Sequence, residues 1–293
     1  MNSFFKNKKA FLIFTVPLLL IYTTVIVYPV LQTFVMSFFK WDGLNIPEYI
    51  GLENFKKVFE SKDLKVSFYN GLKYSAFIAI YQIGIASIIA NILNSKRLRF
   101  RKFFRTAYFI PVVLSITVVS QLWIAIYHAE FGLLNKVFES LGIDYQQSWL
   151  FENNTAIYAV AFVDAWKGMG YHLILIYAGL RAIPETYFEA AQVDGANAWK
   201  KFTKVTLPMM SETYKICLTL TLTWGFRAFE AIYIMTKGGP GNASYTMPLM
   251  VYKGIFSLNN NGFAASTAVI LLLQCVVVMF VVEKIFHRKS FEV

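Results

Sequence analysis

Long apolar runs separated by short charged segments dominate the chain. Three of them contain no Asp, Glu, Lys or Arg: Ala10 to Phe39, Tyr74 to Ser95 and Gly254 to Val282. A fourth run, Thr106 to Ala129, has only His128 as a group that titrates near neutral pH. A hydrocarbon core about 30 Å thick requires about 20 apolar residues in a helix, whose backbone hydrogen bonds are all satisfied within the segment. Each run is therefore predicted to be a transmembrane helix.

Two further apolar runs are interrupted by titratable side chains, which are Asp164, Lys167, His172, Arg227 and Glu230. Together the runs predict an all-α, polytopic bundle of six transmembrane helices, and residues 1–293 form a single transmembrane domain. The expected spans cover about 10–39, 74–95, 106–129, 155–180, 212–236 and 258–284.

Composition agrees with lipid as the solvent for much of this chain. Hydrophobic residues make up 57% of it and charged residues only 15%, whereas soluble domains carry about 25% charged residues. The net charge of +11 collects at the ends of apolar runs and not along one wetted face, which argues against nucleic-acid binding. Cys217 and Cys275 lie in apolar segments without metal-ligand or disulfide spacing, so we interpret them as packing residues.

The basic residues also predict the orientation, because loops rich in Lys and Arg tend to remain cytoplasmic. They collect before the first span, between the second and third, between the fourth and fifth, and after the sixth. The members of these four groups are Lys6, Lys8, Lys9, Lys96, Arg97, Arg99, Arg101, Lys102, Arg105, Arg181, Lys200, Lys201, Lys204, Lys215, Lys284, Arg288 and Lys289. All lie on one side if both termini are cytoplasmic. The opposite loop between Lys40 and Lys73 has room for a short amphipathic helix around 52–59.

The cytoplasmic segment 181–211 reads as two short helices. Pro184 suits a first helical position and Gly195 a helix end. A second helix is expected from Asn197 to Lys204, and Leu207-Pro208 would lead into the fifth span. The first helix would lie at the membrane surface.

This segment resembles a known family motif. Glu189-Ala190-Ala191, three residues, Gly195, nine residues, Val205, one residue and Leu207-Pro208 is similar to the EAA loop of binding-protein-dependent ABC transporter permeases. Isoleucine is more frequent in that pattern where Val205 stands. The extended form 188–196 is similar to the carbohydrate-importing branch, as are Trp41-Asp42-Gly43, 51–55, Ile110-Pro111 and 236–240.

The resemblance implies that segment 181–211 couples transport to a separate ATPase. The residues that it assigns to this coupling loop are Glu189, Ala190, Ala191, Asp194, Gly195, Leu207 and Pro208. The chain has no Gly-x-x-x-x-Gly-Lys-Ser/Thr loop, so it is not expected to be an enzyme or to bind a cofactor, and ATP and Mg would reside on partners. The implied partners are a second homologous permease, two ATPase subunits, an extracytoplasmic solute-binding protein and a sugar, in the bacterial cell membrane.

Charged residues within spans usually face a bundle interior or a water-filled cavity. Asp164 and Lys167 are three residues apart, as are Arg227 and Glu230, so each pair could meet on one helix face. Aromatic and small residues nearby suit a sugar ring. The candidate solute-binding residues are Asp164, Lys167, Gly168, Tyr171, Thr221, Trp224, Gly225, Arg227 and Glu230.

Several alternatives stay open at this point. The two charge pairs could instead be neutralised pairs that only hold helices in register, and His172 is more simply a packing residue than a metal ligand. The solute could be anionic, such as a sugar phosphate or sugar acid. A proton-coupled secondary transporter, a membrane enzyme and an inert structural subunit are the rival classes, although no inverted repeat or catalytic motif is visible.

Overall fold

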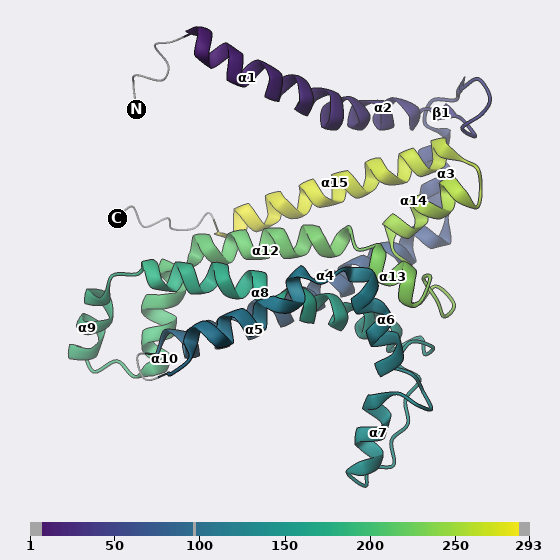
Figure 1. Cartoon of the computed structure of the whole chain (residues 1–293). Helices are drawn as coiled ribbons and strands as arrows, with labels where there is room; N and C mark the ends of the chain where they lie inside the picture. The colour runs from purple at the N-terminus through teal and green to yellow at the C-terminus, as the bar shows by residue number, and fades with distance from the viewer. Residues whose placement is uncertain (1–7, 96–97, 287–293) are drawn as a thin grey trace. The chain divides into compact units, whose positions relative to one another are not determined.

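The computed structural model describes residues 8–95 and 98–286 and is helical nearly throughout (Figure 1). The chain divides into two compact units, one of residues 1–61 with 250–270 and one of 62–249 with 271–293. We describe each unit by itself. Five of the basic residues used to predict the orientation lie outside the described residues, namely Lys6, Lys96, Arg97, Arg288 and Lys289.

The first unit begins with one long helical run. It comprises α1 (Lys8–Tyr22), the π-turn η2 (Thr23–Val27) and α2 (Tyr28–Met36). Pro29 has no N–H for the carbonyl four residues earlier, and the preceding turn widens so that Tyr28 N–H bonds Thr23 O. Residues 12–36 are long and apolar enough to span a membrane, and this chain buries none of their side chains. A helix that is apolar on all sides needs cover from lipid or from another subunit.

A short strand pair and α3 follow in the first unit. β1 (Phe39–Lys40) and β2 (Glu48–Tyr49) are antiparallel, with Phe39 opposite Tyr49. The turn between them is fixed by Asp42, whose carboxylate accepts hydrogen bonds from the backbone N–H groups of Asn45 and Leu44, both at 2.9 Å. These bonds lower the pKa of Asp42 to about 2.

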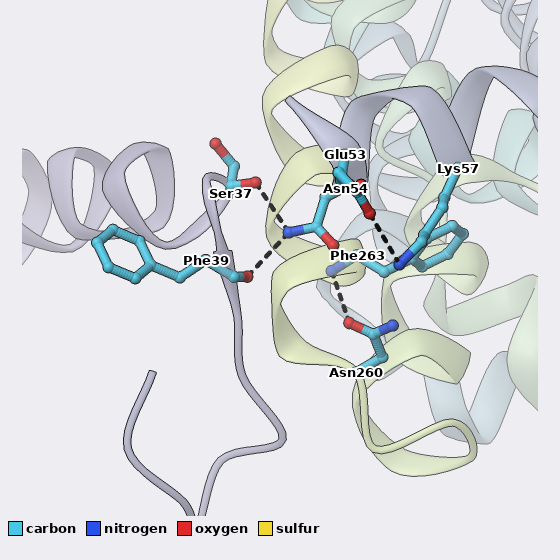
Figure 2. A network of polar contacts seen from close by, with 7 residues as sticks. All are labelled: Ser37, Phe39, Glu53, Asn54, Lys57, Asn260 and Phe263. Atoms are coloured by element: carbon cyan, nitrogen blue, oxygen red, sulfur yellow. Dashed lines mark hydrogen bonds and ion pairs between the residues drawn. The ribbon is translucent and has the colours of Figure 1, made fainter. Parts of the chain in front are cut away.

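Asn54 connects α3 (Glu53–Glu60) to the preceding chain. Its buried amide donates to the carbonyls of Ser37, at 3.0 Å, and Phe39, at 2.8 Å, as Figure 2 shows. Gly262 packs against the hydrogen bond between Asn54 and Phe39, because a Cβ on this glycine would meet both Phe39 O and Asn54 Nδ2. The short helix expected around 52–59 is confirmed, and a buried asparagine explains why its place is fixed.

The second unit is built around α8 (Ala156–Ala182), which packs against α4 (Lys62–Asn94), α5 (Arg101–Val113), α6 (Ile116–Ile126), α12 (Ser211–Phe226) and α13 (Glu230–Met235). Buried side chains from three of these helices form what we call the inner core cluster. Its members are Ala86, Ala90 and Leu93 of α4, Leu173, Ile176 and Leu180 of α8, and Met210, Tyr214 and Cys217 at α12. Cys217 is fully buried there, in agreement with its interpretation as a packing residue.

Two of the expected spans are not straight helices. The run 106–129 is divided into α5 and α6, which are bent by 97° at Leu114 and Ser115. The run 212–236 is divided at 227–229 into α12 and α13. Pro111 accounts for the first break, since it lacks an N–H donor and disturbs the last turn of α5. Each of these two runs is therefore a pair of helices divided by a break, and whether each pair forms one span stays a prediction.

The remaining helices lie between and after these elements. They are α7 (Leu133–Ser140), α9 (Glu185–Val193), α10 (Ala198–Lys201), η3 (Phe202–Thr206), α11 (Leu207–Met209), α14 (Met247–Phe256) and α15 (Asn261–Phe286), of which α7 and α14 were not predicted. Among the described residues, three helical stretches are long and apolar enough to cross a membrane, or four if α5 and α6 count as one span. Six spans with cytoplasmic termini stay a prediction.

Candidate functional site

Segment 181–211 folds into the two expected helices. Pro184 caps α9 instead of opening it, and the helix ends with Gly195 at a φ of +70°. Ala196 N–H bonds Ala191 O at 2.9 Å and Gly195 N–H bonds Gln192 O at 3.1 Å. This reciprocal pattern closes a helix on a glycine that can adopt left-handed backbone. The side chain of Asn197 then caps α10 by accepting from Lys200 N–H at 2.9 Å.

The two short helices are held both to each other and to the second unit. Lys201 Nζ donates to Gln192 Oε1 at 3.2 Å, and Ile183 and Phe188 pack against the inner core cluster. The chain then continues through the π-turn η3, where Leu207 N–H bonds Phe202 O just before Pro208. The segment is thus an ordered part of the second unit, and Figure 1 shows α9 and α10 beyond the end of α8.

The outer surface of this segment carries both polar and apolar residues. Glu189, Ala190, Asp194 and Gly195 are exposed. Sequence reasoning missed that two apolar side chains are exposed beside them: Val193 is 88% and Trp199 71% exposed. The segment therefore presents apolar as well as polar side chains at its surface.

The second candidate site is a pocket inside the second unit, between α4, α5, α8 and α12. It has a volume of about 90 Å³. The pocket brings together five of the predicted solute-binding residues, which are Asp164, Lys167, Gly168, Tyr171 and Trp224. It adds Ile78, Gln82, Val112 and His172. Tyr171 is 43% and Trp224 65% exposed, so these two rings are available to a ligand.

Asp164 and Lys167 do not pair with each other as their spacing suggested. The carboxylate of Asp164 accepts from the hydroxyl of Tyr74 on α4 at 2.6 Å. Lys167 Nζ donates to the carbonyl of Val112 at 3.0 Å. That carbonyl lies in the last turn of α5, where the helix break leaves it without an intrahelical donor, and a cation suits this helix end. Each charge therefore has a partner from a different helix.

Arg227 and Glu230 do not share a helix face either. Arg227 is the residue that ends α12 and Glu230 the one that begins α13, so the i, i+3 geometry does not apply. Both are exposed, and neither lines the pocket. Neither predicted i, i+3 pair forms, for two different reasons. Asp164 and Lys167 lie on the unbroken helix α8 but bond groups of α4 and α5, whereas Arg227 and Glu230 are separated by the break between α12 and α13.

Two other predicted residues are buried next to the pocket without lining it. Gly225 allows α12 to approach α4, since a Cβ there would lie 2.6 Å from Ser75 Cα. Thr221 is 1% exposed and bonds His172 Nε2 at 3.0 Å. Gly168 in contrast lines the pocket, and a Cβ there would meet the Gln82 amide, whose Nε2 donates to Asp164 O at 3.1 Å.

Aromatic rings beside the pocket pack with each other. Trp123 of α6 meets Phe162 at 5.3 Å and Trp166 at 5.7 Å between ring centroids, and Tyr81 of α4 meets Phe162 at 5.3 Å. Edge-to-face contacts of this kind stabilise helix packing. Trp166 therefore belongs to an aromatic cluster between α4, α6 and α8.

The pocket contains polar donors and acceptors, one cation and aromatic surface, a combination that can orient a small polar ligand. Among the described residues, no group of three or more His, Cys, Asp and Glu lies together that could hold a metal ion. Sequence reasoning missed Tyr74, Gln82 and His172. For Tyr74 and Gln82 the available signal was a polar side chain within the apolar run of the second span, which points to a bundle interior.

Comparison with known proteins gives consistent results. Residues 82–291 match the model of the family described as binding-protein-dependent transport system inner membrane component. The chain is 32% identical to the probable ABC transporter permease protein YurN of Bacillus subtilis strain 168, over 96% of this chain and 97% of that protein. It is 30% identical to the arabinooligosaccharides transport system permease protein AraP of the same organism, over 97% of this chain and 90% of AraP.

The fold is also similar to that of a solved structure. A chain from the crystal structure of a bacterial ABC transporter that imports the acidic polysaccharide alginate aligns with a TM-score of 0.80 and 20% identity, covering 97% of both chains. A second structure of a bacterial alginate ABC transporter, in complex with a periplasmic protein that holds an alginate pentasaccharide, gives a TM-score of 0.80 at 21% identity and 98% coverage of both chains.

Proposed function

The chain belongs to the family of binding-protein-dependent transport system inner membrane components, and from this premise we propose that it translocates a sugar or oligosaccharide by ATP-driven import. The solute would be delivered by an extracytoplasmic binding protein, and ATP would be hydrolysed by separate subunits that act on segment 181–211. As a permease subunit of an ABC importer, this chain contributes the membrane path.

The observation that carries the proposal is the ordered, exposed surface of segment 181–211. A connector without a partner would not need a glycine-closed helix end, a capped second helix and an anchor in the inner core cluster. Val193, Trp199 and Glu189 are all exposed on this segment, so it offers apolar groups together with a charged hydrogen-bond acceptor. These features suit docking into an ATPase subunit, with Mg and ATP held by that partner.

Support for a sugar comes from the pocket and from relatives. The pocket is lined by Tyr171 and Trp224, whose ring faces can stack on sugar C–H surfaces, and by the polar groups of Asp164 and Lys167. Its volume of about 90 Å³ is too small for an oligosaccharide, which agrees with a cavity that a second, homologous permease completes. One relative is named for arabinooligosaccharides and another, from Thermococcus litoralis, for trehalose and maltose.

The membrane arrangement is part of the same proposal. We place six spans across the bacterial cell membrane, with both termini cytoplasmic and the solute-binding protein docking on the opposite side. The uncovered run 12–36 is accounted for if it lies against lipid or against the companion permease.

The test uses the complete transporter, with its companion permease, ATPase and binding protein, in proteoliposomes. Uptake should require ATP on the side of the membrane where the ATPase subunits lie. It should persist when a protonophore collapses the proton gradient. Glu189→Lys should leave the assembly intact by gel filtration yet reduce uptake more than tenfold and abolish solute-stimulated ATP hydrolysis. Glu139→Lys, the same charge reversal on the exposed face of α7, is the matched control and should transport normally.

Two results would contradict the proposal. Uptake that depends on the proton gradient and not on ATP would indicate a secondary transporter. Wild-type transport by a stably assembled Glu189→Lys variant would remove the docking role of segment 181–211.

A further inference from the structure

His172 is the most enclosed titratable side chain of the pocket. It lies in the middle of α8, is 4% exposed and lines the pocket with Asp164, Lys167, Gln82 and Trp224. The ring of Tyr171 stands edge-on to the imidazole, with centroids 5.6 Å apart. One imidazole nitrogen has a protein partner and the other has none among the described residues.

The partner of the first nitrogen determines which atom carries the proton. Nε2 lies 3.0 Å from Thr221 Oγ1. The Thr221 hydroxyl also donates to the carbonyl of Cys217, at 2.7 Å, and a hydroxyl has one proton to give. Oγ1 must therefore accept a hydrogen bond from Nε2–H. In a neutral imidazole the proton is then on Nε2, and Nδ1 is a bare acceptor.

That acceptor is buried and unsatisfied within the part of the chain that the structure describes. Buried polar atoms in native proteins nearly always have a partner, and one without a protein partner points to a ligand or an ordered water. The pocket holds no second donor that already meets it: the Gln82 amide donates to Asp164 O, Tyr74 donates to the Asp164 carboxylate, and Lys167 donates to Val112 O.

From this we propose that His172 contacts the solute directly, with Nδ1 accepting a hydrogen bond from a hydroxyl group of a neutral saccharide. The inference rests on the proposed transport function and deepens it by naming the group that is recognised. Nδ1 and the second oxygen of Asp164 are both acceptors, so this side of the pocket requires donors from the solute. Hydroxyl groups supply them, whereas a carboxylate has no proton to donate to these two atoms and could be attracted only by Lys167 on the same pocket wall.

The alternative is that His172 serves only to hold α8 against α12 through Thr221. Substitution of His172 by glutamine or by asparagine separates these two roles. The side-chain amide of glutamine takes the place of Nε2, whereas that of asparagine takes the place of Nδ1. His172→Gln keeps a donor for Thr221 and removes the acceptor from the pocket. His172→Asn keeps an acceptor in the pocket and removes the donor for Thr221.

The experiment measures ATP-dependent uptake by the complete transporter in proteoliposomes, with maltotriose, arabinotriose and trehalose as neutral probes. For the probe that the wild type transports, and with loaded binding protein in saturating excess, His172→Gln should lower the uptake rate about tenfold while the affinity of the binding protein for the probe is unchanged. A tenfold change corresponds to about 1.4 kcal/mol, within the range expected for one hydrogen bond. His172→Asn should rescue most of this loss, to about threefold or less. Both variants are first checked for assembly by gel filtration.

The outcomes are distinct. If the wild type transports none of the probes while its ATPase is active, its solute is not a neutral saccharide of these kinds, and this inference is overturned together with that part of the proposed function. If the wild type transports but both variants stay within twofold of its uptake rate at saturating loaded binding protein, only the role of His172 is overturned. A normal glutamine variant together with an impaired asparagine variant also overturns it, since the ring then acts through Thr221 alone.

Discussion

Tyr74 and Asp164 form a hydrogen bond between α4 and α8 whose loss should be costly. The hydroxyl donates to the carboxylate at 2.6 Å, a length typical of an O–H···O⁻ bond. Tyr74 itself is completely buried. Hydrogen bonds to charged groups contribute about 1.5–3 kcal/mol, and removing one partner leaves the other unsatisfied. We expect Tyr74→Phe, which deletes only the hydroxyl, to lower the free energy of unfolding by about 2 kcal/mol.

A double-mutant cycle isolates this interaction from the packing of the ring. In an Asp164→Leu background no carboxylate remains, so the same Tyr74→Phe change should cost less than about 0.5 kcal/mol. The four proteins are unfolded by SDS in mixed micelles and followed by the fluorescence of the six tryptophans. Equal costs of Tyr74→Phe in the two backgrounds would refute the reasoning, because the hydroxyl would then contribute nothing through Asp164.

Two further stability predictions use matched controls. Asn54→Asp keeps the shape of the side chain but places a carboxylate against two carbonyl oxygens (Figure 2), so we expect a loss of about 3 kcal/mol in the same SDS titration. Lys57→Ala, which removes an exposed ion pair on the same helix, should cost less than about 0.5 kcal/mol, and similar losses for both would contradict the role of the amide. Gly225→Val should separate α12 from α4, because its Cβ would lie 2.6 Å from Ser75 Cα, and we expect a loss of at least about 2 kcal/mol. Gly84→Val, where a Cβ meets nothing within 4 Å, should be tolerated to within about 1 kcal/mol.

Sequence periodicity and composition were sufficient for the helical fold, the position of segment 181–211 and the short helix α3. These features depend on local signals: a long apolar run, a proline at a helix start, a glycine at its end. The break in the fifth run lies at 227–229, next to the charges Arg227 and Glu230 that interrupt that run. The break in the third run lacked such a signal in the hydropathy, which stays apolar across Leu114 and Ser115. Only Pro111 indicated that the helix would be disturbed.

The charged residues of the candidate pocket could be predicted from the sequence, but their bonding partners could not. Asp164 and Lys167 stood out as charges in an apolar run, and the structure places both at the pocket. Their partners, Tyr74 and the carbonyl of Val112, come from other helices, and one sequence carries no direct signal of which helices touch. His172 was interpreted as a packing residue because its unsatisfied nitrogen is visible only once the bonds of Thr221 are known.

The length of α4 has a mechanical consequence. Its 33 residues make a rod of about 50 Å at 1.5 Å per residue, roughly 20 Å longer than a hydrocarbon core. The end near Leu93 lies in the inner core cluster that supports α9. Near the opposite end, Asn70 Nδ2 donates to the carbonyls of Asn242 and Tyr245, both at 3.0 Å. A pivot of such a rod by about 10° about its centre displaces each tip by about 4 Å. If α4 and the helices packed on it pivot together, a displacement at the α9 end would be accompanied by an opposite displacement of the loop around Asn242.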